Sequence, residues 1–238
     1  MQDRGRARLD HLVFVSDVLG DGVDRFEQRT GVRLPAGGRH PLMGTHNCLT
    51  RVAPGVFLEL LAIDTEAEPP ERARWFELDR PDPSGRSTAE PRLLTWVLGV
   101  PDLQAALQGL RRAGIDAGRS VEQRRGHLSW NIALRDDGSL IEHGAFPVLI
   151  QWPAGIDPTS SMSDVGLRIE RLRVTHPDPA WLEAALGCVD APGIARIGRG
   201  EPGLDVTLRD RNGSLTRWRS RPADAAATAT SAPPPSQR

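Results

Sequence analysis

The sequence contains no tyrosine and no lysine, so all 30 of its basic residues are arginine. This bias is typical of coding DNA rich in G and C, an interpretation we prefer to a special need for guanidinium chemistry. Cysteine is also scarce. Cys48 and Cys188 are the only two and lie far apart in the sequence, which predicts neither a cysteine metal cluster nor a disulfide framework.

Long apolar runs are missing as well. No stretch is long enough to span a membrane, and the first residues, MQDRGRARLDHL, lack the apolar segment of a secretory signal. The net charge of −1 gives no electrostatic reason to expect a nucleic acid or an anionic membrane as a partner. We therefore expect a cytoplasmic protein that binds neither, and 238 residues suffice for a sizeable core.

The first part of the chain predicts a βαβββ unit over residues 9–64. A strand over 9–16 is rich in Val, Leu and Phe, and a helix follows over 21–31 with Gly31 as its C-cap. Residues 32–44 carry much Pro and Gly and predict a loop with a short edge strand. Two strands, over 45–52 and 56–63, flank a tight turn. Residues 65–91 are polar and Pro-rich, which predicts a linker with a helical turn near Trp75.

The same order returns over residues 92–155. A strand over 92–100 precedes the helix 101–114, in which Leu103, Leu107 and Leu110 share one face. Strands then follow in HLSWNIAL and FPVLIQW. Residues 165–220 predict a partial third unit, and 221–238, rich in Ala, Thr and Pro, predict a disordered tail. The fold class we expect is α+β, with paired βαβββ units forming a curled mixed sheet around a central cavity.

Aligning the two units pairs particular residues. His11 falls opposite Trp96 within one residue, and the pair His46-Asn47 falls opposite Trp130-Asn131. In the last strands, Leu58-Glu59-Leu60 matches Ile150-Gln151-Trp152. Because Asn recurs in both units while His46 does not, this alignment favours a scaffold role for the two Asn and a site role for His46.

These patterns resemble a known family. The segments DHLVFVSD and FLELLAID open and close the first unit, and GGRHPLMGTHNCLTRVAPGVFLELLA follows the pattern GGxHPxxGTHNxL…LELLA. Both features resemble glyoxalase-like domain proteins of the vicinal-oxygen-chelate superfamily. The resemblance implies two units whose sheets curl around one site, with metal ligands on the first and last strand of each unit.

Carried over by position, the resemblance implies His11 and Glu59 as ligands of a divalent ion such as zinc, manganese or iron. The second unit has Trp96, or Thr95, and Gln151 at the matching positions, and Trp cannot ligate a metal. The third ligand is then either His46 or Gln151. Independently of the resemblance, Glu59 lies inside an apolar strand, where a buried carboxylate needs a metal, an Arg or a His as its partner.

The role of His46 depends on the register of one hairpin. In one register His46 shares a face with Glu59, and a slip of one residue puts Asn47 there instead; we expect the first. His46 and Glu59 are accordingly the catalytic candidates. Trp96, Trp130 and Gln151 are the candidates for substrate binding, since Trp side chains suit an apolar pocket. We expect His40, His127 and His143 to lie at the surface.

Two functions compete. The first is a metal-dependent enzyme of the isomerase, lyase or dioxygenase type, acting on a small metabolite that chelates through adjacent oxygen atoms. The second is a non-catalytic, drug-sequestering binder on the same fold, which the loss of two ligand positions favours. A closed structural module is the third possibility. We expect a small-molecule ligand and a monomer or homodimer.

Overall fold

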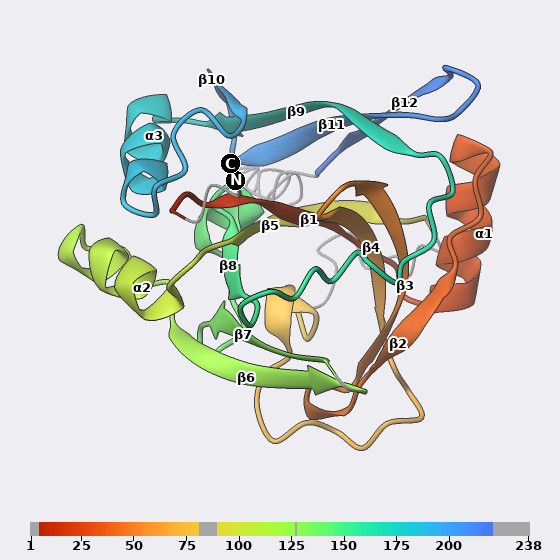
Figure 1. Ribbon diagram of the computed structural model, residues 1–238, viewed down its shortest axis with the longest axis horizontal. Helices are drawn as coiled ribbons and strands as arrows, with labels where there is room; N and C mark the ends of the chain where they lie inside the picture. The colour runs from red at the N-terminus through yellow and green to blue at the C-terminus, as the bar shows by residue number, and fades with distance from the viewer. Residues whose placement is uncertain (1–4, 81–89, 127, 221–238) are drawn as a thin grey trace, which may run out of the picture.

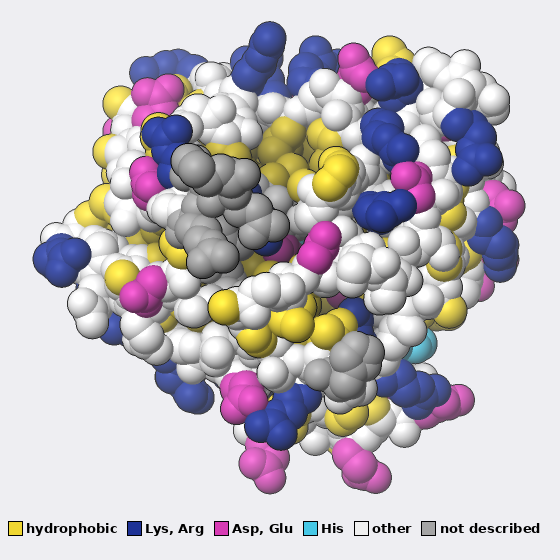
Figure 2. All heavy atoms as spheres, in the orientation of Figure 1, with side chains coloured by type: hydrophobic (Ala, Val, Ile, Leu, Met, Phe, Trp, Pro, Cys, Tyr) yellow, Lys and Arg dark blue, Asp and Glu magenta, His cyan; other side chains and the backbone are white. Residues whose placement is uncertain are grey.

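The computed structural model describes residues 5–80, 90–126 and 128–220. Within these residues the chain forms an eight-stranded mixed sheet and a four-stranded sheet. Figure 1 shows the larger sheet curled around a central space, with the smaller one across its upper side. Figure 2 shows arginine and acidic side chains spread over one face, with hydrophobic side chains between them.

The first predicted unit is present, with the expected elements. Strand β1 (Arg8–Val15) is followed by helix α1 (Leu19–Thr30), which ends at Gly31 in the left-handed conformation, as its missing Cβ permits. The short edge strand β2 covers Ala36–His40. The hairpin that follows consists of β3 (Thr45–Ala53) and β4 (Val56–Ile63). A short 3₁₀ turn over Trp75–Glu77 lies within the predicted linker, at the place where the sequence predicts a helical turn.

The second unit repeats this order. It consists of β5 (Arg92–Gly99), α2 (Leu103–Arg112), β6 (Arg119–Arg125), β7 (Leu128–Leu134) and β8 (Val148–Gln151). Strand β6 was not predicted, because its sequence RSVEQRR is polar and it lies at the edge of the sheet, where one side faces solvent. The α+β expectation of paired βαβββ units is confirmed.

The strand order of the large sheet is β2-β3-β4-β1-β5-β8-β7-β6. The two units meet at the antiparallel pair β1 and β5, while β1 runs parallel to β4 and β5 parallel to β8. The edge strands β2 and β6 approach each other, since a Cβ on Gly38 would lie 2.6 Å from Cδ of Arg125. The sheet is thus nearly closed and has an inner and an outer face.

Two hydrophobic clusters cover the two faces. The outer one joins the sheet to the helices and the smaller sheet, and includes Phe14, Phe26, Leu60 and Trp96. The inner one fills much of the curled sheet and consists of Val13, Val15, Met43, Leu61, Trp75, Phe76, Val97, Trp130, Ile132, Leu134, Leu140 and Ile150. Alternate residues of each central strand therefore belong to different clusters, as the period of two requires.

The C-terminal sheet repeats the element order but not the pairing. It is built from β9 (Arg168–His176), α3 (Pro179–Gly187), β10 (Arg196–Arg199), β11 (Gly203–Arg209) and β12 (Leu215–Arg219). Its order is β10-β9-β11-β12, with β9 parallel to β10 and antiparallel to β11. In the first unit, by contrast, the first strand, β1, pairs in parallel with the last strand, β4. The predicted tail lies outside the described residues, and the unit boundaries stay predictions.

No helix within the described residues combines the length and the apolar character that crossing a bilayer requires.

Trp218 on β12 attaches the C-terminal sheet to the large one. Its ring stacks on Phe26 at 5.4 Å and meets Phe14 edge-on at 5.1 Å, with the guanidinium of Arg29 3.8 Å from its centroid. We expect Trp218→Ala to lower the free energy of unfolding by about 3–5 kcal/mol, because the ring is buried. Urea unfolding measures this. Leu215→Ala, on the exposed part of the same strand, is the control and should cost well under half as much.

Candidate active site

A cavity opens on the inner face of the large sheet. Its walls come from β1, β2, β4, β6, β7 and β8 and from the 3₁₀ turn Trp75–Glu77. Its lining is mainly aromatic and apolar: Phe57, Trp75, Phe76, Trp130, Ile132, Ile150 and Trp152. Four polar side chains interrupt this lining, namely His11, His40, Glu59 and Arg125. The space free of protein atoms in the cavity and at its open mouth is about 370 Å³.

His11 lies on β1 with its ring held on both sides. Its Nδ1 lies 2.7 Å from Oδ1 of Asp10, a fully buried carboxylate, and its ring stacks on Phe57 at 4.3 Å. Neighbours in a regular strand point to opposite faces, but the β1–β5 register shifts between Leu9 and His11. Such a bulge re-aims side chains and allows Asp10 to reach the ring beside it. Nε1 of Trp152 donates to the other oxygen, Oδ2, of Asp10 at 2.9 Å.

Glu59 is buried in β4 and has two partners. Its Oε2 lies 3.6 Å from Nε2 of His11, and its Oε1 accepts a hydrogen bond of 2.6 Å from Nδ2 of Asn47. Oδ1 of Asn47 in turn accepts from the backbone N–H of Gly38 at 2.8 Å, which fixes the orientation of the amide. The buried carboxylate expected from the sequence therefore has an imidazole and an amide as its partners.

The hairpin register decides against His46. In the β3–β4 pairing Leu49 lies opposite Glu59 and His46 lies opposite Ala62. Asn47, two residues from Leu49, therefore shares the inner face with Glu59, and His46 points to the other face. The expectation that His46 shares a face with Glu59 is wrong, because the alternative register, one residue away, is the one that forms.

In all three aligned strand pairs, the alignment of the two units matches side chains that lie on different faces of the sheet. Trp96 lies opposite Leu12 in the β1–β5 pairing, and both belong to the outer cluster, whereas His11 lies on the inner face. Nε1 of Trp96 donates to the carbonyl oxygen of Ala145, which also belongs to the outer cluster. Asn131 is exposed, so it does not share the inward position of Asn47.

Gln151 lies outside the cavity for the same reason. Its Oε1 accepts from the backbone N–H of Leu103, at the start of α2. Its neighbours Ile150 and Trp152 line the cavity in its place. Trp130 does line the cavity, as expected.

His40 was expected at the surface but is only 2% exposed and lines the cavity. Its Nδ1 lies 3.2 Å from Oγ1 of Thr45, and its ring meets Trp75 edge-on at 5.0 Å. Burial lowers the pKa of His40 to about 4, so the ring is neutral at neutral pH. The Pro/Gly-rich surroundings of His40 hid it, since they predict a loop. His143 is exposed as expected, and His127 lies outside the described residues.

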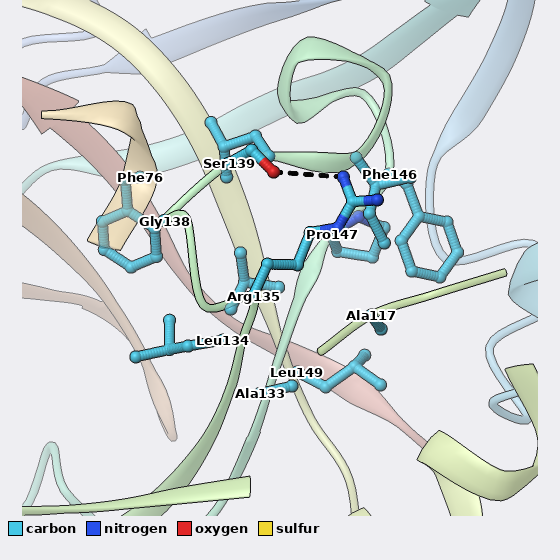
Figure 3. Close-up of a pocket in the computed structure, with 13 residues that line it drawn as sticks. Phe76, Ala117, Ala133, Leu134, Arg135, Gly138, Ser139, Phe146, Pro147 and Leu149 are labelled. Carbon is cyan, nitrogen blue, oxygen red and sulfur yellow. Dashed lines mark hydrogen bonds between the residues drawn. The ribbon is translucent and has the colours of Figure 1, made fainter. Parts of the chain in front are cut away.

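A second small cavity lies beside the first, beyond Phe76. Figure 3 shows its lining, which includes Phe146, Pro147 and Leu149 and is almost entirely apolar. Its one charged side chain, Arg135, donates through Nη1 to Oγ of Ser139 at 3.1 Å. This cavity brings together no acid, base or nucleophile, so the chemistry belongs to the cavity that contains His11 and Glu59.

The donor set does not fit a resident divalent ion held by three protein ligands. Nε2 of His11 and Oε2 of Glu59 lie 3.6 Å apart, and the oxygen of Asn47 already accepts from Gly38. Within the described residues, no group of three or more His, Cys, Asp and Glu side chains is arranged to hold a metal. The cation of Arg125 also faces this cavity, which disfavours a second cation there.

The lowered pKa of His40 predicts a pH dependence of stability. Its unfolded value is about 6.5, so the unfolded chain takes up this proton before the folded protein as the pH falls. The contribution of His40, roughly 3 kcal/mol, is present above pH 6.5 and is lost as the pH falls to about 4. Urea unfolding at several pH values measures this effect, and in His40→Gln the free energy of unfolding should fall less between pH 6.5 and 4 than in the wild type. A slope equal to that of His143→Gln, at an exposed site, would contradict the assignment.

Comparison with known proteins identifies the fold. A crystal structure of a hypothetical protein from Staphylococcus aureus is 16% identical and superposes with a TM-score of 0.58, over 89% of this chain and 98% of that one. Methylmalonyl-CoA epimerase from Mycobacterium tuberculosis is 21% identical, with a TM-score of 0.40 over 64% of this chain and 93% of that one. At such identities the likeness concerns the fold alone.

A family model described as a glyoxalase-like domain matches residues 9–188. No curated protein matches the sequence significantly. The matched range covers most of the chain and includes both βαβββ units and every residue that lines the cavity. The chain therefore belongs to the glyoxalase-like domain family, within the vicinal-oxygen-chelate superfamily.

Proposed function

We propose that this protein is an enzyme that moves a proton on a small molecule bound in the aromatic cavity, as an isomerase or lyase does beside a carbonyl group. The observation that carries the proposal is the line of contacts from Asp10 through His11 to Glu59. It brings an imidazole and a carboxylate together at a cavity wall that is otherwise mostly apolar.

The hydrogen bond to Asp10 selects how His11 acts. When the Asp10 carboxylate accepts from Nδ1–H, the other nitrogen, Nε2, carries the lone pair and faces Glu59. His11 can then accept a proton at Nε2, and the buried Asp10 stabilises the imidazolium that results. The hydrogen bond from Trp152 holds Asp10 in place.

Glu59 supplies the second proton site. Its Oε2 lies within reach of the same space as Nε2 of His11, while Asn47 occupies Oε1. A proton removed by one group can therefore be returned from the other, which is what isomerisation of a C–H bond beside a carbonyl requires. The apolar walls keep most water away and so strengthen the electrostatic interactions with charge that develops on the substrate.

Metal dependence is not required for these steps, and no step here passes through a metal. A metal-dependent isomerase, lyase or dioxygenase, as the resemblance implies, would need ligands from the substrate or solvent besides His11 and Glu59.

The mostly aromatic lining favours a second candidate, a non-catalytic binder of flat molecules. Trp130 and Trp152, whose ring centroids lie 5.1 Å apart, present π faces that suit such a ligand. Ligand-dependent thermal stabilisation without turnover would identify this function.

Proton transfer is tested by exchange. Wild-type protein in D₂O, given a panel of small 2-oxo and 2-hydroxy carbonyl compounds, should wash out the C–H signal of at least one compound in NMR spectra. His11→Asn and Glu59→Gln should each slow this washout by about 10²–10⁴-fold, because each removes one proton site.

Matched controls are His143→Asn and Glu122→Gln, which change the same residue types at exposed positions. Both should retain the wild-type rate. EDTA should leave the rate unchanged, and a rate that disappears with EDTA and returns with zinc or manganese would favour the metal-dependent alternative. Washout that survives in both His11→Asn and Glu59→Gln would contradict the proposed function.

The positioning role of Asp10 gives a separate prediction. Asp10→Asn is nearly isosteric, but its amide can donate to Nδ1 and so favours the tautomer with a proton on Nε2. We expect kcat to fall by at least about 10²-fold, with KM nearly unchanged and the acidic limb of the pH–rate profile shifted. A rise in KM alone, at constant kcat, would show that Asp10 only shapes the cavity.

A further inference from the structure

Arg125 is the one cationic side chain, within the described residues, among those that line the cavity. It lies at the end of β6, on the wall formed by β6 and β7, whereas His11 and Glu59 belong to β1 and β4. Its guanidinium carbon is 5.9 Å from the ring centroid of Trp130. The cation thus shares the cavity with the proposed proton-transfer pair but comes from the other unit.

The guanidinium is half-buried, and none of the described acidic side chains forms an ion pair with it. No ion pair or hydrogen bond joins it to any other side chain in the described part of the chain, although the charge of Glu59 acts on it from across the cavity. Burial lowers the pKa of Arg125. Most of the other arginines for which partners are described pair with acidic groups at the surface, as Arg124 does with Glu122. A half-buried guanidinium without a partner costs free energy that an anionic ligand would offset.

The opposite strand is shaped to accept this arginine. A Cβ on Gly38 of β2 would lie 2.6 Å from Cδ and 3.1 Å from Cγ of Arg125, so a larger residue at this position would force the arginine stem to shift. Gly38 also donates its N–H to Asn47, the partner of Glu59. The same glycine therefore determines both where the cation lies and how the carboxylate is oriented.

We propose that Arg125 binds a carboxylate on the ligand, so that the molecule taken by this cavity is a small organic acid with a flat apolar body. This inference deepens the proposed function, on whose cavity it rests, by naming the class of substrate. The guanidinium offers parallel N–H donors that match a carboxylate. The aromatic walls take the apolar body, and the end away from Arg125 faces His11 and Glu59.

The test uses two probes of nearly equal shape, benzoate and its neutral analogue benzamide, with phenyl phosphate as a third. Binding is followed by the fluorescence of the cavity tryptophans and by calorimetry. Wild-type protein should bind benzoate more tightly than benzamide. Arg125→Gln should weaken benzoate binding by at least about tenfold while changing benzamide little, and Arg125→Lys should retain part of the preference.

The matched control is Arg124→Gln, because Arg124 is the adjacent residue and its side chain is 72% exposed. It should keep the full preference for benzoate. Gly38→Ala should reduce the preference without removing any charge, since the added methyl group displaces the arginine stem.

The measurement needs no turnover and is repeated in His11→Asn, where the preference should persist. Failure of proton transfer and failure of anion recognition are therefore distinguishable. Equal binding of benzoate and benzamide by the wild type, no binding of either, or a preference that survives Arg125→Gln would each overturn the proposal. Tighter binding of phenyl phosphate than of benzoate, lost in Arg125→Gln, would overturn the carboxylate assignment in favour of a phosphate ester.

Discussion

The structure of the site depends on one constraint, the burial of the Glu59 carboxylate within an apolar strand. A buried charge without partners is too costly for a marginally stable fold. The chain meets this cost with two neighbours that come from different strands, the amide of Asn47 and the imidazole of His11. Both contacts require the strands β3, β4 and β1 to pair in one register, so a slip in either pairing would remove one of the two partners of the carboxylate.

The two units contribute different chemistry to the same cavity. The first supplies His11, Glu59 and their partners, all on the strands β1, β3 and β4. The second supplies Trp130, Ile150 and the cation of Arg125, so it forms apolar walls and a charged edge. Two units with the same element order can differ in this way, because the outer cluster packs the helices against the sheet while the side chains at the cavity differ between the units.

Much of the fold could be predicted from the sequence because its signals are local. Strand runs, the helix from Leu103 to Leu110 and the cap at Gly31 depend on neighbours within a few residues. The site was predicted only in part. Glu59 was singled out because a charged residue in an apolar strand is conspicuous, whereas His11 came from the resemblance by position. Asp10, beside His11, carried the same signal as Glu59 but was missed. His40 and Arg125 lie among Gly, Pro and polar residues that look like surface.

The sequence by itself determined the paired units, the apolar strands and the presence of a buried carboxylate that needs partners. Only the tertiary structure decided which partners it has. Strand side chains alternate with a period of two, so a shift of one residue exchanges Asn47 for His46, Ile150 for Gln151 and the inner face for the outer. Local sequence scarcely distinguishes two registers that differ by one residue. The packing of the inner and outer faces of the large sheet, by contrast, is compatible with only one of these registers.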